Sequence, residues 1–208
     1  MSAKQGLLKW LCAFVAFDIL VIGALLTPQL LSVPGVGARG TGALTAFLAP
    51  PVLLLLNTLV PQDIKHILVF WRFRDVLPAH RAFSKYVHGD PRIDGAALEA
   101  RIGAFPSDPR DQQNLWYRLY QRHKLDVSVV DAHRPFLVFR YLAALSFLLA
   151  IFLPATLWGF GYYVATWSTL AVFAGQFLLA VAASRQAAKR FVCTVLSLES
   201  HAPLPPKP

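Results

Sequence analysis

Asp18 is the residue whose type and place most suggest chemistry, because it stands inside a long apolar run, residues 7–31. At ~1.5 Å per residue it would lie roughly 16 Å into a bilayer, where an ionised carboxylate costs ~3 kcal/mol on insertion scales. We therefore expect Asp18 to face water or a polar partner. Ser146 and Gln176, in later apolar runs, stand at a similar depth, and Asn57 is shallower.

Two interpretations of this intramembrane polar set, Asp18, Ser146 and Gln176, stay open. In the first it belongs to an ion- or proton-conducting path, or to a polar contact that responds to voltage or lipid. In the second, Asp18 is a protonated acid that is hydrogen-bonded between helices. No basic residue lies at the depth of Asp18, and the spans hold no second carboxylate, which weakens a transporter and excludes an intramembrane aspartyl protease.

The amino-acid composition indicates the class of protein in which the polar set must be held. The chain has 208 residues, of which 56% are hydrophobic and only 15% charged, and its mean hydropathy is +0.49. A soluble domain carries about 25% charged residues, and a disordered chain cannot leave so much apolar surface unburied. The composition predicts an integral membrane protein.

Four apolar stretches are long enough to cross a bilayer, at residues 7–31, about 45–59, 136–153 and about 162–183. We expect an all-α fold with four transmembrane helices and a small helical cytoplasmic domain between spans two and three. The expected divisions are residues 1–60 (spans one and two with a short outer loop), 61–135 (the basic helical domain), 136–183 (spans three and four), 184–200 (a helical extension of span four) and 201–208 (a flexible, proline-rich tail).

The distribution of charge predicts the orientation. The formal net charge is +9, with 20 lysines and arginines against 11 acidic residues. Thirteen of the basic residues lie between Lys65 and Arg140, and others flank the first and fourth spans. The outer segment between the first two spans carries only Arg39. Because basic residues are retained on the cytoplasmic side, we expect both termini and the central domain in the cytoplasm.

Start and stop signals divide the central domain into helices. We expect a helix from Asp63 to about Val76, a short one over residues 80–86, and one over 95–102 that is capped by Asp94. Asp108 before a proline predicts another helix start. Asp126 would cap a last segment that leads into span three, with a kink at Pro135 and an end at Pro154.

Aromatic and basic residues alternate in residues 65–74, directly after span two. Such a tract is typical of a headgroup-level helix that binds anionic lipid. Stacking on single-stranded nucleic acid is the disfavoured alternative. A phosphate-bearing ligand could also use these cations if the tract folds back into the central domain. The candidate ligand- or lipid-binding residues are Lys65, Arg72, Arg74, Arg81 and Lys85.

Other sites are sparse in the sequence. Trp116 and Tyr120 form an apolar aromatic stripe on an expected helix, which we interpret as a surface for a cytosolic partner protein. Asp131 and His133 lie near Ser128, but no nucleophile-elbow sequence surrounds any serine. No histidine pair or cysteine cluster has the spacing of metal ligands. We expect no enzyme activity, metal or cofactor.

Residues 70–84, from Phe70 through the Arg72, Arg74 and Pro78 region to Ser84, together with residues 115–120, resemble small four-span bacterial membrane proteins of antiphage defence operons. The resemblance covers about the central third of the chain. It implies a membrane-embedded, oligomeric sensor or effector of the bacterial inner membrane that works with a cytosolic partner. It assigns no site residue.

Three functions remain open at this point. The first is an inner-membrane sensor or effector, a homo-oligomer that couples a cytoplasmic partner or ligand to a membrane event such as ion leakage. The second is a passive anchor or scaffold that recruits a cytosolic protein through the stripe at Trp116 and Tyr120. The third is a small transporter that depends on Asp18.

Overall fold

The computed structural model describes residues 6–31 and 37–202, and the side chains of all of these except residues 28–31 and 37–42. The expected outer loop around residues 32–36 and the tail from residue 203 lie outside the described residues. Every regular element in the described part is a helix, which confirms the all-helical prediction.

The chain divides into two compact units, each of which is described by itself. Residues 6–69 and 138–183 form the first, called the apolar unit. Residues 70–137 and 184–202 form the second, called the basic unit. The first boundary differs from the expected one at residue 61, because residues 61–69 belong to the apolar unit.

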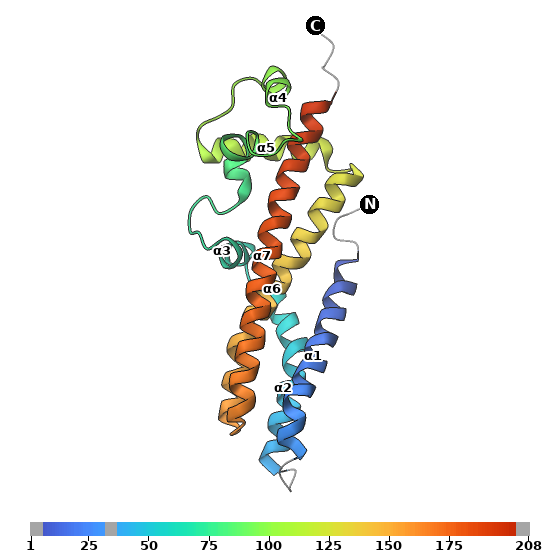
Figure 1. Cartoon of the computed structure of the whole chain (residues 1–208), viewed down its shortest axis with the longest axis vertical. Coiled ribbons are helices and arrows are strands. Elements are labelled where there is room, and N and C mark those ends of the chain that lie inside the picture. The colour runs from blue at the N-terminus through green and yellow to red at the C-terminus, as the bar shows by residue number, and fades with distance from the viewer. Residues whose placement is uncertain (1–5, 32–36, 203–208) are drawn as a thin grey trace. The chain divides into compact units, whose positions relative to one another are not determined.

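The apolar unit is built from helices α1 (Leu7–Leu31), α2 (Gly37–Leu59) and α3 (Gln62–Phe70) with parts of α6 (Val127–Gly159) and α7 (Tyr163–His201) (Figure 1). Within the described residues, three helices, α1, α6 and α7, are long and apolar enough to cross a membrane. The pair α2 and α3, bent by 109°, raises the number to four if it is counted as one span. Their length and hydropathy indicate a membrane protein.

Large apolar side chains point outward from this unit. On α1, Leu20 is 72% exposed, and on α7, Leu179 is 74% exposed, whereas Asp18 is fully buried. Water would penalise such a surface, but hydrocarbon does not. The arrangement, with apolar groups outside and a polar group inside, is the one that a lipid environment stabilises.

Prolines do not end the helices of this unit. α2 begins at Gly37 rather than near Thr45 and contains Pro50 and Pro51, and α6 continues past Pro154 to Gly159. The expected end of span three at Pro154 is therefore wrong. Proline removes one donor and crowds one turn, which helices in apolar surroundings tolerate when neighbouring groups satisfy the freed carbonyls. A short turn with Gly161 at φ +81° then reverses the chain into α7.

The expected helix over residues 63–76 is shorter, because α3 ends at Phe70. Trp71 has φ +52°, the left-handed conformation that terminates many helices but that side chains with a Cβ disfavour by roughly 1–2 kcal/mol. The Arg185 guanidinium lies 4.4 Å from the centre of the Trp71 ring, and this cation–π contact offsets part of that cost.

In the basic unit, two predicted caps are confirmed. Asp94 accepts a hydrogen bond from the Ala97 amide at the start of α4 (Gly95–Ile102), and Asp108 caps α5 (Pro109–His123). The expected short helix is a 3₁₀ turn, η1 (Pro78–Arg81), followed by a π-helical turn, η2 (Ala82–Tyr86). The buried side chain of Gln112 accepts hydrogen bonds from the Phe83 and Ser84 amides, so it holds η2 against α5.

The long final helix is also as predicted, since α7 continues to His201. Near its end, Glu199 is the centre of an ion-pair network, with a side chain that is only 2% exposed. Its Oε1 accepts hydrogen bonds from Arg101 at 3.3 Å and Arg122 at 3.2 Å, and its Oε2 accepts one from His123 at 2.7 Å. These contacts tie α4 and α5 to α7.

The electrostatics of Glu199 follow from these contacts. Glu199 stands sixteen residues, roughly 24 Å of helix, beyond the apolar unit's last residue, Ala183. Burial alone would raise the pKa of its carboxyl, but the hydrogen bond from His123 and the surrounding positive charges outweigh burial and lower this pKa below its ordinary value of 4.5. The ionised form therefore stabilises the basic unit.

We expect Glu199→Gln to destabilise the basic unit by about 3 kcal/mol, because loss of one member of a buried ion-pair network leaves its partners uncompensated. Thermal unfolding of the purified protein in detergent measures the change. Glu99→Gln is the matched control, since Glu99 is exposed on α4 and should change stability by less than ~0.5 kcal/mol.

The contribution of Glu199 to the stability of the basic unit should decrease at low pH. Because the folded pKa of Glu199 is lowered, its contribution is present above pH 4.5 and is lost as the pH falls through the folded value. The stability difference between the native protein and Glu199→Gln should shrink below pH 4.5. A difference that stays constant to pH 3 would contradict the role assigned to the carboxylate.

Candidate functional site

The sequence of α1 places Asp18 on the helix face that packs inside the apolar unit. Leu11, Val15, Ile22 and Leu26 recur at steps of three and four residues and are all buried. Asp18 occupies the middle of this stripe and is 0% exposed. A carboxyl group therefore stands where the pattern of the helix calls for a leucine.

The structure brings the three predicted intramembrane polar residues together. The Nε2 amide of Gln176 on α7 donates to Asp18 Oδ1 at 3.0 Å and to Ser146 Oγ on α6 at 3.2 Å. Ser146 is fully buried and Gln176 half-buried. One amide thus connects α1, α6 and α7. We call Asp18, Ser146 and Gln176 the polar triad.

The polar triad is only partly satisfied. Asp18 Oδ2 is buried, and no group in the described part of the chain lies within hydrogen-bonding distance of it. The donor at Oδ1 is a neutral amide, which compensates a buried carboxyl less than a cation would. Such a contact can be rearranged at a lower free-energy cost than the fully satisfied packing around it.

Asn57, the shallower candidate companion, lies elsewhere. It is fully buried on α2, and its amide donates to the Tyr141 carbonyl at 3.0 Å. It therefore belongs to the contact between α2 and α6 and is separate from the polar triad.

The five candidate ligand- or lipid-binding cations do not form one site in the basic unit. Arg72, Arg74 and Lys85 are exposed there, and Arg81 is half-buried. Lys65 is fully buried in the apolar unit. The tract does not form one continuous amphipathic helix, because the chain is not helical between Trp71 and Leu77.

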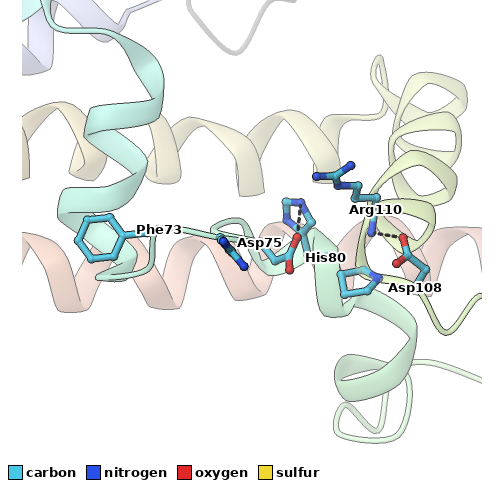
Figure 2. Close-up of a pocket in the computed structure, with 7 residues that line it drawn as sticks. Phe73, Asp75, His80, Asp108 and Arg110 are labelled. Atoms are coloured by element: carbon cyan, nitrogen blue, oxygen red, sulfur yellow. Dashed lines mark hydrogen bonds and ion pairs between the residues drawn. The ribbon is translucent and has the colours of Figure 1, made fainter.

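The tract does fold back onto the basic unit, where it lines an open cleft of about 550 Å³. Figure 2 shows Phe73, Asp75 and His80 on one side and Asp108 and Arg110 at the start of α5. Arg74 also lines the cleft, so it is the single member of the predicted cation set that does so.

Charges in this cleft nearly balance. His80 Nε2 lies 3.7 Å from Asp75 Oδ1, and the Asp108 carboxylate accepts hydrogen bonds from the Arg110 and Asp111 amides. Two arginines and two carboxylates leave no strong electrostatic preference for a phosphate-bearing ligand. The cleft is polar, but it is a weaker candidate site than the polar triad.

The predicted partner surface is corrected by the structure. Trp116 is 7% exposed, its Nε1 donates to the Val192 carbonyl at 3.4 Å, and its ring packs edge-on against Phe191. Tyr120 stacks on Trp116 and is partly buried. The aromatic stripe packs against α7 and forms part of the core of the basic unit. It is therefore not exposed for contact with a partner protein. Tyr117, 53% exposed, is the outward aromatic residue of α5.

Two further features were not predicted from the sequence. Arg140 is buried at the start of the apolar part of α6, beside Tyr141 and α3, and Glu199 organises the end of α7. A lone arginine near the start of the apolar run 136–153 was a sequence signal for the burial of Arg140. The pairing of Glu199 with residues 76 to 98 positions earlier left no signal in the sequence.

No group of three or more potential metal ligands occurs in residues 6–31 and 37–202. Comparison of the chain with protein-family models, curated proteins and solved structures finds no match. The assignment of function therefore depends on the chain's own geometry.

We expect a double-mutant cycle of Asp18→Leu and Gln176→Leu to give a coupling free energy of about 1 kcal/mol, the range measured for hydrogen bonds between membrane helices. Reversible unfolding in mixed micelles measures each variant. Strict additivity of the two substitutions would show that the contact between Asp18 and Gln176 contributes nothing to stability.

Proposed function

We propose that the protein is a membrane-embedded sensor or effector without enzyme activity. In this proposal it has four spans in a bacterial inner membrane, and its termini and basic unit lie in the cytoplasm. The excess of basic residues in residues 65–140 supports this orientation. It would couple a cytosolic partner or ligand to a membrane event such as ion leakage, as in antiphage defence.

The polar triad is the observation that carries the proposal. A carboxyl group buried among apolar helices is costly and is retained where it serves a function. Asp18 has one neutral donor and one oxygen without a partner in the described part of the chain, so a small movement of α1, α6 or α7 changes its environment. Such a movement would open a path for ions or protons.

The route for a signal is supported by chain connectivity. α6 contributes Val129 to the core of the basic unit and Ser146 to the polar triad, and α7 contributes Phe191 and Gln176 in the same way. A ligand or partner that alters the packing of α6 or α7 in the basic unit thus acts on the helices that hold Asp18.

The two alternatives have less support. The scaffold hypothesis relied on the stripe at Trp116 and Tyr120, and the burial of Trp116 counts against it. The transporter hypothesis needs a substrate site in the spans, and Asp18 has only Gln176 and Ser146 around its one bonded oxygen.

We expect Asp18→Asn to reduce membrane depolarisation at least tenfold in bacteria that overproduce the chain. Asparagine keeps the acceptor for Gln176 but loses the titratable carboxyl. A potential-sensitive dye measures the effect at equal amounts of protein in the membrane fraction.

Thr169→Val is the matched control, because Thr169 is fully buried on α7 and its hydroxyl bonds only to carbonyls of its own helix. This variant should behave as the native chain does. Full depolarisation by Asp18→Asn, or none by the native chain, would contradict the proposal.

The proposal also includes a homo-oligomer, because α1 and the part of α7 in the apolar unit expose large apolar side chains, such as Phe17, Leu20, Leu178 and Leu179, that can pack against further copies as well as lipid. The mass of the purified protein in a mild detergent should correspond to two or more chains. A strictly monomeric protein would remove the oligomeric part of the proposal and leave the role of Asp18 within one chain.

A further inference from the structure

Four consecutive exposed side chains follow α3 at the start of the basic unit. They alternate an aromatic ring with a guanidinium, and we call them the aromatic–basic loop: Trp71, Arg72, Phe73 and Arg74. Trp71 is 57% exposed and Phe73 is 87% exposed. Water disfavours two such rings so close together, and exposed apolar groups beside charged ones are typical of an interaction site.

The backbone at both ends of this loop is strained. Trp71 has φ +52° and Asp75 has φ +47°, and no other non-glycine residue in the described part of the chain has a positive φ. Side chains with a Cβ disfavour this conformation, which persists where contacts fix it, often at functional sites. The Arg185 guanidinium lies 4.4 Å from the centre of the Trp71 ring, and His80 Nε2 lies 3.7 Å from Asp75 Oδ1. The loop is therefore held in a defined conformation that leaves its side chains exposed.

The chain itself keeps the aromatic–basic loop near the apolar unit. Val69 is the last residue of that unit before the loop, and two residues of chain span at most ~7 Å. On α7, Arg185 follows Ala183, the last residue of the apolar unit there, by two residues, or roughly 3 Å of helix. The loop thus begins where the apolar surface of the protein ends.

The sequence of exposed residues along α7 indicates the depth of this boundary in a bilayer. In the described part of α7, Leu178 and Leu179 are the last large apolar side chains that are exposed. Arg185 stands six residues, or roughly 9 Å of helix, beyond Leu179. The headgroup region on each side of the hydrocarbon core is about 5–8 Å thick. A ring that packs on Arg185 would therefore lie at about the level of the lipid headgroups.

The chemistry of the loop fits that level. Tryptophan is enriched where lipid meets water, because its ring is apolar and its edge is polar, and phenylalanine is common on the membrane-facing side of interfacial segments. The guanidinium groups of Arg72 and Arg74 can each donate two parallel hydrogen bonds to a phosphate. Basic residues next to a membrane are attracted by anionic lipids. One bilayer surface can thus accommodate both the rings and the charges.

We propose that the aromatic–basic loop docks on the surface of an anionic bilayer. The rings of Trp71 and Phe73 insert among the headgroups, and Arg72 and Arg74 bind lipid phosphates. The loop thereby anchors the start of the basic unit to the membrane. This surface lies outside the polar triad, and the inference does not rest on the proposed function.

The test measures how close position 73 lies to lipid in the full chain. Phe73→Cys in a Cys12→Ser background carries a fluorophore, and lipids with a nitroxide at the headgroup quench it. Cys193 is only 1% exposed and should not react with the label. The protein is placed in nanodiscs of phosphatidylcholine with increasing fractions of phosphatidylglycerol. We expect quenching to rise with the phosphatidylglycerol fraction to a defined midpoint.

Tyr117→Cys in the same background is the matched control, because Tyr117 is also an exposed aromatic residue beside an exposed arginine, Arg118 on α5. A label at position 117 should show no quenching that depends on phosphatidylglycerol. It reports whether any exposed pair of this kind in the basic unit reaches the lipid.

Substitution of the arginines tests their role. Serine at both Arg72 and Arg74 should raise the midpoint fraction of phosphatidylglycerol at least about fivefold, since each basic residue near a membrane surface contributes roughly a fivefold gain in binding. Lysine at both positions keeps the charges and should keep most of this binding. Both side chains are exposed, so these variants should unfold at the temperature of the native chain.

The other outcomes contradict the proposal. Quenching at position 73 that never exceeds quenching at position 117 would overturn it and would leave the loop as a surface for a protein partner. Equal quenching in phosphatidylcholine alone, unchanged by the serine substitutions, would overturn the role of the arginines and of anionic lipid. Asp18→Asn should leave quenching at position 73 unchanged, so failure of the proposed function does not alter this result.

Discussion

The constraint on which this structure depends is that hydrocarbon offers no hydrogen bonds. Each polar group in the apolar unit must therefore find its partner within the protein. The hydroxyls of Thr169 and Ser168 donate to carbonyls of α7, and that of Thr166 donates to the carbonyl just before this helix. The amide of Asn57 donates to a carbonyl of α6. The hydroxyl contacts are local, whereas the contact of Asn57, the polar triad and the contact of the Lys65 ammonium with the Tyr141 ring join distant parts of the chain.

The basic unit is small, so its core is built from few residues. This core consists largely of aromatic rings and of side chains from α6 and α7, the helices that also belong to the apolar unit. The rings of His133 and Phe191 lie parallel with centres 4.4 Å apart, and Trp116 meets Phe191 edge-on. Without the ends of α6 and α7, this core would lose a large part of its apolar surface, so the unit has no means of folding independently of them.

Much of the fold could be predicted because the relevant signals are local. Apolar run lengths predicted the long helices, and capping residues predicted the starts of α4 and α5. Depth along the spans predicted that Asp18, Ser146 and Gln176 could meet. Predictions were wrong where tertiary contacts determine the structure. Trp116 was predicted to face a partner but is buried in the core, and α6 was predicted to end at Pro154 but continues through it. The contact of the Lys65 ammonium with the Tyr141 ring joins residues about seventy-five positions apart, which no local pattern encodes.

The short turn at Gly161 has a consequence for the register of the helical hairpin formed by α6 and α7. Ser146 stands thirteen residues before the end of α6 at Gly159, and Gln176 stands thirteen residues after Tyr163, the first residue of α7. Both side chains are therefore roughly 20 Å from the turn, and their heights match because the two arms are equally long. One residue added to either arm would rotate its polar side chain by about 100° around the helix axis and face it towards lipid. The equal lengths of the two arms thus place Gln176 opposite Ser146. The contact depends on these lengths as much as on the identity of the two residues.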